Sequence, residues 1–251
     1  MMKLLGRLGT VGAAALILGP FSKPMPLSGQ ASDFLLRTPK ATLGIHSGYA
    51  LAMAGSDIFD FTRENLTLSR RDFDAVAFGG QLAFRLNPRL DLAFDLSIAN
   101  ASKRSEFRDW VGTDDLPIEQ TTDFFRLPLT VGVKSYLRDR GRSVGRLAWV
   151  ANRWAPYVGA GAGWVWYRFE QDGEWVDHET LDIFRDTFIS RGSAPTIHVY
   201  GGVEWTLGPA VFLTTEARYA WARADLSRDF VGFDALDLSG IQATAGISLR
   251  F

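Results

Sequence analysis

Apolar and polar residues take turns along this chain in stretches of about ten residues, and the alternation recurs eight times. Successive side chains of a β-strand point to opposite faces, so a period of two predicts strands with one apolar and one polar face. The predicted strands cover residues 41–50, 76–86, 90–98, 125–137, 156–169, 196–207, 211–221 and 240–251. The same stretches lack helical periodicity, which predicts an all-β fold.

The connections between these strands alternate in length. Four long ones cover residues 51–75, 99–124, 170–195 and 222–239, and the three between them are shorter. Long connections at one end and short ones at the other predict an eight-stranded antiparallel up-and-down barrel. In an outer membrane, long loops face the outside and short turns face the periplasm. Both ends of the strand array then lie on the periplasmic side.

Two kinds of burial would explain the alternation: a soluble barrel hides its apolar face inside, and a membrane barrel turns that face toward lipid. Four aromatic residues on the apolar face lie near the loop ends of their strands, where a membrane girdle is expected. These residues are Trp164, Trp166, Tyr219 and Trp221. The pattern favours a transmembrane barrel with its apolar face outward.

Ionisable residues recur on the polar face, which would line the lumen. An eight-stranded lumen is just wide enough for side chains to fill it, and charges away from water must pair. We therefore expect a structural charge network in the lumen, and a plugged rather than open barrel. Its predicted members are Asp95, Arg126, Lys134, Glu204, Glu216 and Arg218.

The first 31 residues are typical of a secretory signal peptide. Lys3 and Arg7 precede a short apolar run, and Gly29 and Ala31 suit a signal-peptidase cut. We predict cleavage near Ala31, with residues 32–251 forming the barrel domain. The net charge of −1 argues against a general nucleic-acid binder. Cysteine is absent, which excludes disulfides and thiolate chemistry.

The stretches "FRLPLTVGVKSYL" and "PYVGAGAGWVWYRF" resemble the central strands of the eight-stranded outer-membrane β-barrel domain family, which includes OmpA-like, OmpW-like and opacity-type barrels. The closing "ATAGISLRF" resembles the C-terminal signal that the barrel assembly machinery recognises, with Phe251 as its last residue. The resemblance implies an outer-membrane location and contact with lipopolysaccharide and membrane lipids. Because such folds host many activities, it does not imply one.

Candidate chemistry is sparse. His46 and Ser47 are neighbours on a strand and point to opposite faces, so they do not share a proton. Acidic residues crowd 170–186, but their spacing matches no twelve-residue calcium loop. We expect no catalytic, cofactor or metal site. The prediction is a monomeric, closed structural or surface-interaction barrel, and the alternative is a porin-like channel for small solutes or hydrophobic ligands.

Overall fold

The protein is described by a computed structural model that covers residues 34–112, 115–177, 180 and 182–251. The predicted signal peptide, residues 1–31, lies outside the described residues. No helix among the described residues is long and apolar enough to cross a membrane.

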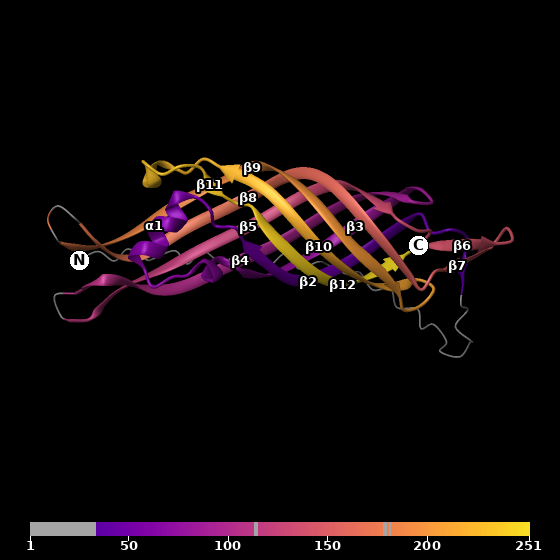
Figure 1. The fold of residues 1–251 in the computed structure, drawn as a ribbon, viewed down its shortest axis with the longest axis horizontal. Helices are drawn as coiled ribbons and strands as arrows, with labels where there is room; N and C mark the ends of the chain where they lie inside the picture. The colour runs from indigo at the N-terminus through magenta and orange to yellow at the C-terminus, as the bar shows by residue number, and fades with distance from the viewer. Residues whose placement is uncertain (1–33, 113–114, 178–179, 181) are drawn as a thin grey trace, which may run out of the picture. The chain divides into compact units, whose positions relative to one another are not determined.

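Eight antiparallel strands close into a ring (Figure 1). Going round it, the strands are β2, β3, β4, β5, β8, β9, β10 and β12, which pairs back with β2. Their bounds are β2 Ala41–Ala52, β3 Ala75–Asn87, β4 Leu90–Val111, β5 Pro117–Tyr136, β8 Trp154–Val176, β9 Ile183–Thr206, β10 Val211–Ala224 and β12 Gly240–Arg250. The predicted all-β, up-and-down barrel of eight strands is confirmed.

Four of the strands are much longer than predicted. β4, β5, β8 and β9 continue past the ring, so most of residues 99–124 and 170–195, expected as loops, is strand. The period of two persists there, but its outward residues are charged instead of apolar, as with Glu170, Asp172 and Glu174 on β8. A pattern that changes from apolar–polar to buried–charged is typical of a strand leaving the membrane for water.

A small cap covers the same end of the barrel. It contains α1 (Asp57–Asn65), the 3₁₀ turns η1 (Arg70–Phe73) and η2 (Arg228–Phe230), and the short strand β11 (Leu236–Asp237). Residues 51–75, expected to be a loop, contain helix α1. This helix has acidic residues in its first turn and Arg63 in its last, as the helix dipole favours, and it buries Ile58, Phe59 and Thr62.

The opposite end carries a second small sheet, in the order β1 (Leu35–Leu36), β7 (Ala148–Ala151), β6 (Gly141–Val144). The connection 138–155, expected to be plain loop, therefore contains a hairpin. Gly145 in its turn has φ +64°, a conformation that favours glycine.

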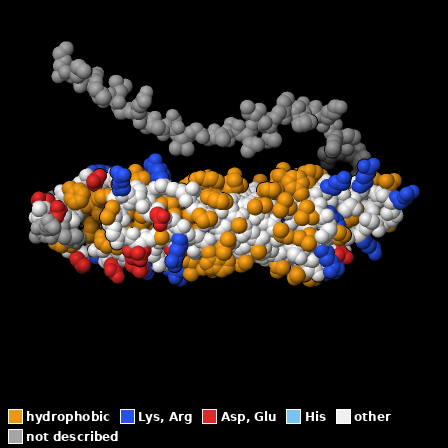
Figure 2. Space-filling view, turned by 90° about the horizontal axis from the view of Figure 1, so that it is seen from above, with side chains coloured by type: hydrophobic (Ala, Val, Ile, Leu, Met, Phe, Trp, Pro, Cys, Tyr) orange, Lys and Arg blue, Asp and Glu red, His pale blue; other side chains and the backbone are white. Residues whose placement is uncertain are grey.

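The barrel wall is apolar outside and polar inside. Ile45 and Ile197 on the outer face are 74% and 60% exposed, whereas Asp91 and Lys134 in the lumen are 1% and 2% exposed. Hydrophobic side chains cover the middle of the wall in Figure 2. The outward face of β12 follows the prediction: Ile241, Ile247 and Leu249 are exposed and Arg250 is buried. This reversal is the arrangement of a transmembrane barrel.

Candidate functional site

An ion-pair cluster fills the middle of the lumen. Arg218 on β10 donates from Nη1 to Asp95 Oδ1 (2.9 Å) and from Nη2 to Glu216 Oε1 (2.9 Å). Asp95 on β4 also lies 3.0 Å from His46 Nε2 on β2. Buried charges are tolerated when they are both paired and hydrogen-bonded, and one arginine here bonds two carboxylates. The cluster ties three strands together across the barrel.

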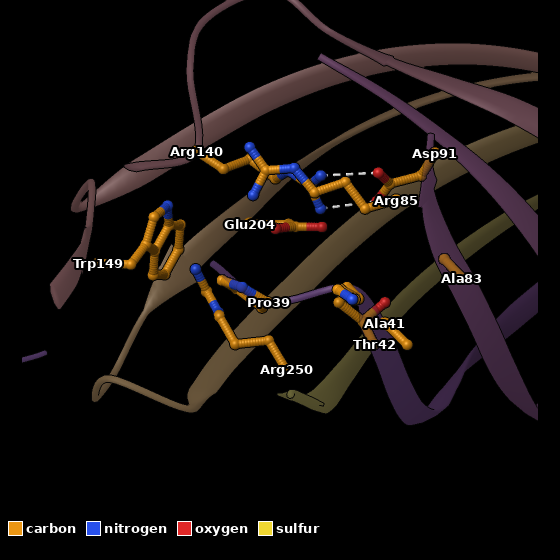
Figure 3. A pocket seen from close by; sticks show the side chains of 11 residues that line it. Pro39, Ala41, Thr42, Ala83, Arg85, Asp91, Arg140, Trp149, Glu204 and Arg250 are labelled. Atoms are coloured by element: carbon orange, nitrogen blue, oxygen red, sulfur yellow. Dashed lines mark hydrogen bonds and ion pairs between the residues drawn. The ribbon is translucent and has the colours of Figure 1, made fainter. Parts of the chain in front are cut away.

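A second polar layer lies nearer the short-turn end (Figure 3). Arg140 donates from Nη1 and Nη2 to the two oxygens of Asp91, both at 2.7 Å. The Tyr136 hydroxyl donates to Glu204 Oε1 (2.6 Å) and lies 3.2 Å from Asp91 Oδ2. Lys134 Nζ is 3.8 Å from Glu204 Oε1. This second layer blocks the lumen on the short-turn side of the first layer.

Tyrosine rings join the two layers. The Tyr157 hydroxyl donates to Glu216 Oε2 in the first layer (2.9 Å), and its ring centroid lies 4.2 Å from Lys134 Nζ in the second. The Tyr200 ring stands edge-on to Tyr157, with centroids 6.3 Å apart. A Cβ added at Gly159 would lie 2.3 Å from Tyr200 Cζ, so glycine there makes room for the ring.

Arg126 stands apart from both layers, although its charge predicted a place in the network. Among the described residues no carboxylate lies within ion-pair distance of it, and its Nε and Nη2 have no hydrogen-bond partner. Its guanidinium lies 4.6 Å from the Phe124 ring centroid. The register explains the separation: Thr130 is the β5 partner of Asp95, and Arg126 lies four residues further, about 13 Å along the strand.

Three small voids lie around these side chains in the described part of the lumen. One of about 10 Å³ lies beside Arg140 and Arg250, one of about 20 Å³ beside His46, and one of about 60 Å³ beside Arg126. A water molecule needs roughly 10–15 Å³ by this measure. The three voids therefore hold one to a few waters each, which is too little for a hydrated ion or a solute.

Above the lumen, the cap forms a hydrophobic core against the inner face of the extended strands. The Phe59 ring on α1 stands edge-on to Phe73, Phe124 and Phe169, with centroids 4.7, 5.4 and 5.7 Å away. Phe230 from η2 continues this stack, 5.6 Å from Phe169. The cap core therefore covers the end of the barrel that lies beyond the two charged layers.

Aromatic residues lie on the outer wall at two levels. The structure places Trp164, Trp166, Tyr219 and Trp221 on the outer face toward the cap, with the Tyr219 and Trp221 rings 4.4 Å apart. A second group, not predicted, is the stacked pair Trp154 and Trp205 at the other end. Trp154 and Trp166 lie twelve residues apart on β8, which is about 28 Å along a barrel axis for a strand tilted ~45°. That distance matches the apolar thickness of a bilayer.

Two other predicted positions can be placed. Ser47 is exposed on the outer wall, on the opposite side of β2 from His46. The Phe251 side chain is also exposed, while its backbone bonds to Ala41 in both directions, at 3.0 Å each. The last strand is thus locked to the first ring strand up to its final residue.

Sequence reasoning missed several lumen members. Tyr136 and Tyr157 lie on the polar face of the predicted strands 125–137 and 156–169, but their bonds to carboxylates depend on register. Arg140 lies in a connection, where alternation carries no information about the lumen. The one available signal was Asp91, a carboxylate on the inward face whose cross-strand partner is Lys134.

No family model and no curated protein matches this chain. Several solved structures do. The outer membrane protein OprG from Pseudomonas aeruginosa is 11% identical, with 86% of this chain and 99% of that chain covered and a TM-score of 0.49. Neisserial surface protein A is 14% identical, with 89% and 100% covered and a TM-score of 0.44. The outer membrane protease OmpT from Escherichia coli is 12% identical, with 87% and 98% covered and a TM-score of 0.35.

Likeness at these levels concerns the fold and carries no inference about activity. The fold itself rests on the closed ring of strands and the outward apolar belt of this chain. The chain has the eight-stranded antiparallel β-barrel fold of outer-membrane proteins, as its sequence resemblance implied.

Proposed function

We propose that this protein is a closed barrel of the outer membrane that presents a folded cap to the outside and catalyses no reaction. The observation that carries the proposal is the double seal of the lumen. Arg218 and Arg140 each bind carboxylates within it, and the cap core covers the end opposite the short turns. With long strands and cap outside, the short turns face the periplasm.

Conductance in planar bilayers tests the closed lumen. The folded wild-type protein is expected to give no reproducible steps. Replacing both Arg218 and Arg140 with alanine removes the bridge in each layer and is expected to permit ion flow. A matched control replaces Arg104 and Arg185, two exposed arginines on the extended parts of β4 and β9 at the cap end, paired with Glu119 and Asp172. Regular steps from the wild-type protein would favour the channel alternative instead.

The arrangement around His46 supports the absence of catalysis. A histidine bonded to a carboxylate can act as a general base, and His46 with Asp95 forms such a pair. The void beside it is about 20 Å³ and is lined also by Thr244 and Ser248. An acyl or peptide substrate does not fit there. Lipase, esterase and peptidase assays on the folded protein are expected to match a His46→Gln variant.

The remaining parts of the proposal concern the envelope. We expect export with cleavage near Ala31, recognition of Phe251 by the barrel assembly machinery, contact with lipopolysaccharide and membrane lipids, and a monomeric state. N-terminal sequencing of the protein from outer-membrane fractions checks the cleavage. A heat-modifiable band on gels checks the folded barrel, and a chain that stays soluble and monomeric without detergent would refute membrane insertion.

A further inference from the structure

The exposed acidic side chains of the barrel are distributed unevenly along its axis and leave an excess of cations at one end. Exposed cations gather at the end with the short turns, where β6 and β7 lie (Figure 2). They are Arg37, Lys40, Arg138, Arg142, Arg146 and Arg153. Among the described residues at this end, the exposed acid is Asp139, and Arg89 Nε already binds it at 2.8 Å. Acidic side chains collect at the cap end, where arginines such as Arg104 and Arg185 accompany them. The near-zero net charge of the chain conceals this asymmetry.

Two of these arginines adjoin the unpredicted tryptophan pair. The guanidinium of Arg138 lies 4.7 Å from the Trp154 ring centroid. Arg153 directly precedes Trp154, and its carbonyl accepts a bond from the Thr206 amide, which follows Trp205 (2.9 Å). The Trp154 and Trp205 rings stack with centroids 6.5 Å apart and 27° between their planes. Neither arginine has a carboxylate within ion-pair distance in the described part of the chain.

The surface beside this cluster is apolar. Trp154 and Trp205 are about two-fifths exposed, and Leu137 and Leu207 next to them are more than half exposed. The outward face then continues into the apolar belt through Val158. A ligand that matches this site needs an anionic group for the arginines and hydrocarbon for the aromatic rings below them.

We propose that the rim formed by Arg138, Arg153, Trp154 and Trp205 binds an anionic phospholipid of the periplasmic leaflet. The phosphate lies between the two guanidinium groups, and the acyl chains lie against the tryptophan pair. The inference rests on the proposed membrane placement and orientation.

Native mass spectrometry of the folded barrel in detergent tests the site. Phosphatidylglycerol and phosphatidylcholine with the same acyl chains are titrated separately. The wild-type protein is expected to retain phosphatidylglycerol more tightly. An arginine near an anionic headgroup changes binding by about fivefold. The variant Arg138→Gln/Arg153→Gln should therefore lose about 25-fold in phosphatidylglycerol affinity and little in phosphatidylcholine affinity.

Three comparisons sharpen the result. Arg104→Gln/Arg185→Gln removes the same charge from the cap end and is expected to change nothing. Arg138→Lys/Arg153→Lys keeps the charge and is expected to retain most of the preference. Trp154→Ala is expected to weaken the binding of both lipids, because it removes part of the aromatic surface.

Equal affinity of the wild-type protein for the two lipids would overturn the inference, and so would an unchanged preference in Arg138→Gln/Arg153→Gln. Full competition by inorganic phosphate would assign the site to free anions instead of lipid. Each variant is first checked for a heat-modifiable band. If the wild-type protein fails to enter vesicles of any composition, the membrane proposal fails; if it inserts without a lipid preference, only the lipid site fails.

Discussion

Arg218 is the residue on which the lumen cluster depends most directly. Replacing it with methionine keeps much of its volume but leaves Asp95 and Glu216 without their shared cation. A charge-assisted hydrogen bond contributes about 1.5–3 kcal/mol, and removing one partner of a buried pair costs about 3–5 kcal/mol. His46 still contacts Asp95, and Tyr157 still donates to Glu216. We therefore expect Arg218→Met to lower the free energy of unfolding by about 3–4 kcal/mol.

Urea unfolding in lipid vesicles, followed by tryptophan fluorescence, measures this loss. The control Arg104→Met removes an arginine paired with Glu119 on the exposed cap surface, where an ion pair contributes at most about 1 kcal/mol. The triple variant D95N/E216Q/R218M removes the stranded charges together and should lose less than Arg218→Met alone. An Arg218→Met loss no larger than that of the control would refute the argument that this cluster holds the barrel together.

Four further outcomes are expected. Arg126→Met should raise the free energy of unfolding by about 1 kcal/mol in the same assay, because it removes a buried charge that has no carboxylate within ion-pair distance among the described residues; a loss would mean that its contact with the Phe124 ring outweighs the cost of burial. Phe59→Ala should lower the stability of the folded cap by about 3–5 kcal/mol, so that protease cuts the cap while the heat-modifiable barrel persists. Burial raises the pKa of Asp72, but hydrogen bonds from Ser69 and the charge of Lys103 outweigh it and hold that pKa below its usual value; the protection of η1 amides against hydrogen exchange, relative to their intrinsic rate at each pH, should therefore fall as the pH drops below about 4, and should not change with pH there in D72N. Deleting Phe251 should reduce membrane assembly in cells more than it lowers the stability of barrels refolded in vitro, and normal assembly would remove its role as a signal.

The eight ring strands could be predicted because a membrane barrel imposes one rule on all of them. Each strand must present apolar residues to lipid and other residues to the lumen, so the period of two is visible without knowledge of the fold. The cap obeys a different rule. On β8, Phe169 and Gln171 are buried under the cap, while Glu170 and Asp172 face water. In the sequence, a charged face interrupted by a few buried residues is typical of a loop.

The sequence predicts which side chains of the candidate site point into the lumen, but not which of them form ion pairs. Alternation shows that Asp95, Arg126 and Arg218 point inward, yet it does not give their height along the barrel. Height depends on strand register, which places Arg218 beside Asp95 and Arg126 nearer the cap. Helix α1 escaped prediction for another reason: nine residues are too few for a clear helical period, and its burial depends on the extended strands around it.

The pairing of β12 with β2 also sets how the barrel can be built. Gly240 pairs with Ala52 and Arg250 with Thr42, so this ladder joins residues about 200 positions apart. Closing so long a loop costs about 5 kcal/mol of chain entropy, which must be recovered in one zippering event. Until that event both strands present free edges, to which the strand of another protein can add. We therefore expect that, if an assembly factor acts on the unfinished barrel, it does so at the β2–β12 seam and is displaced when the two strands pair.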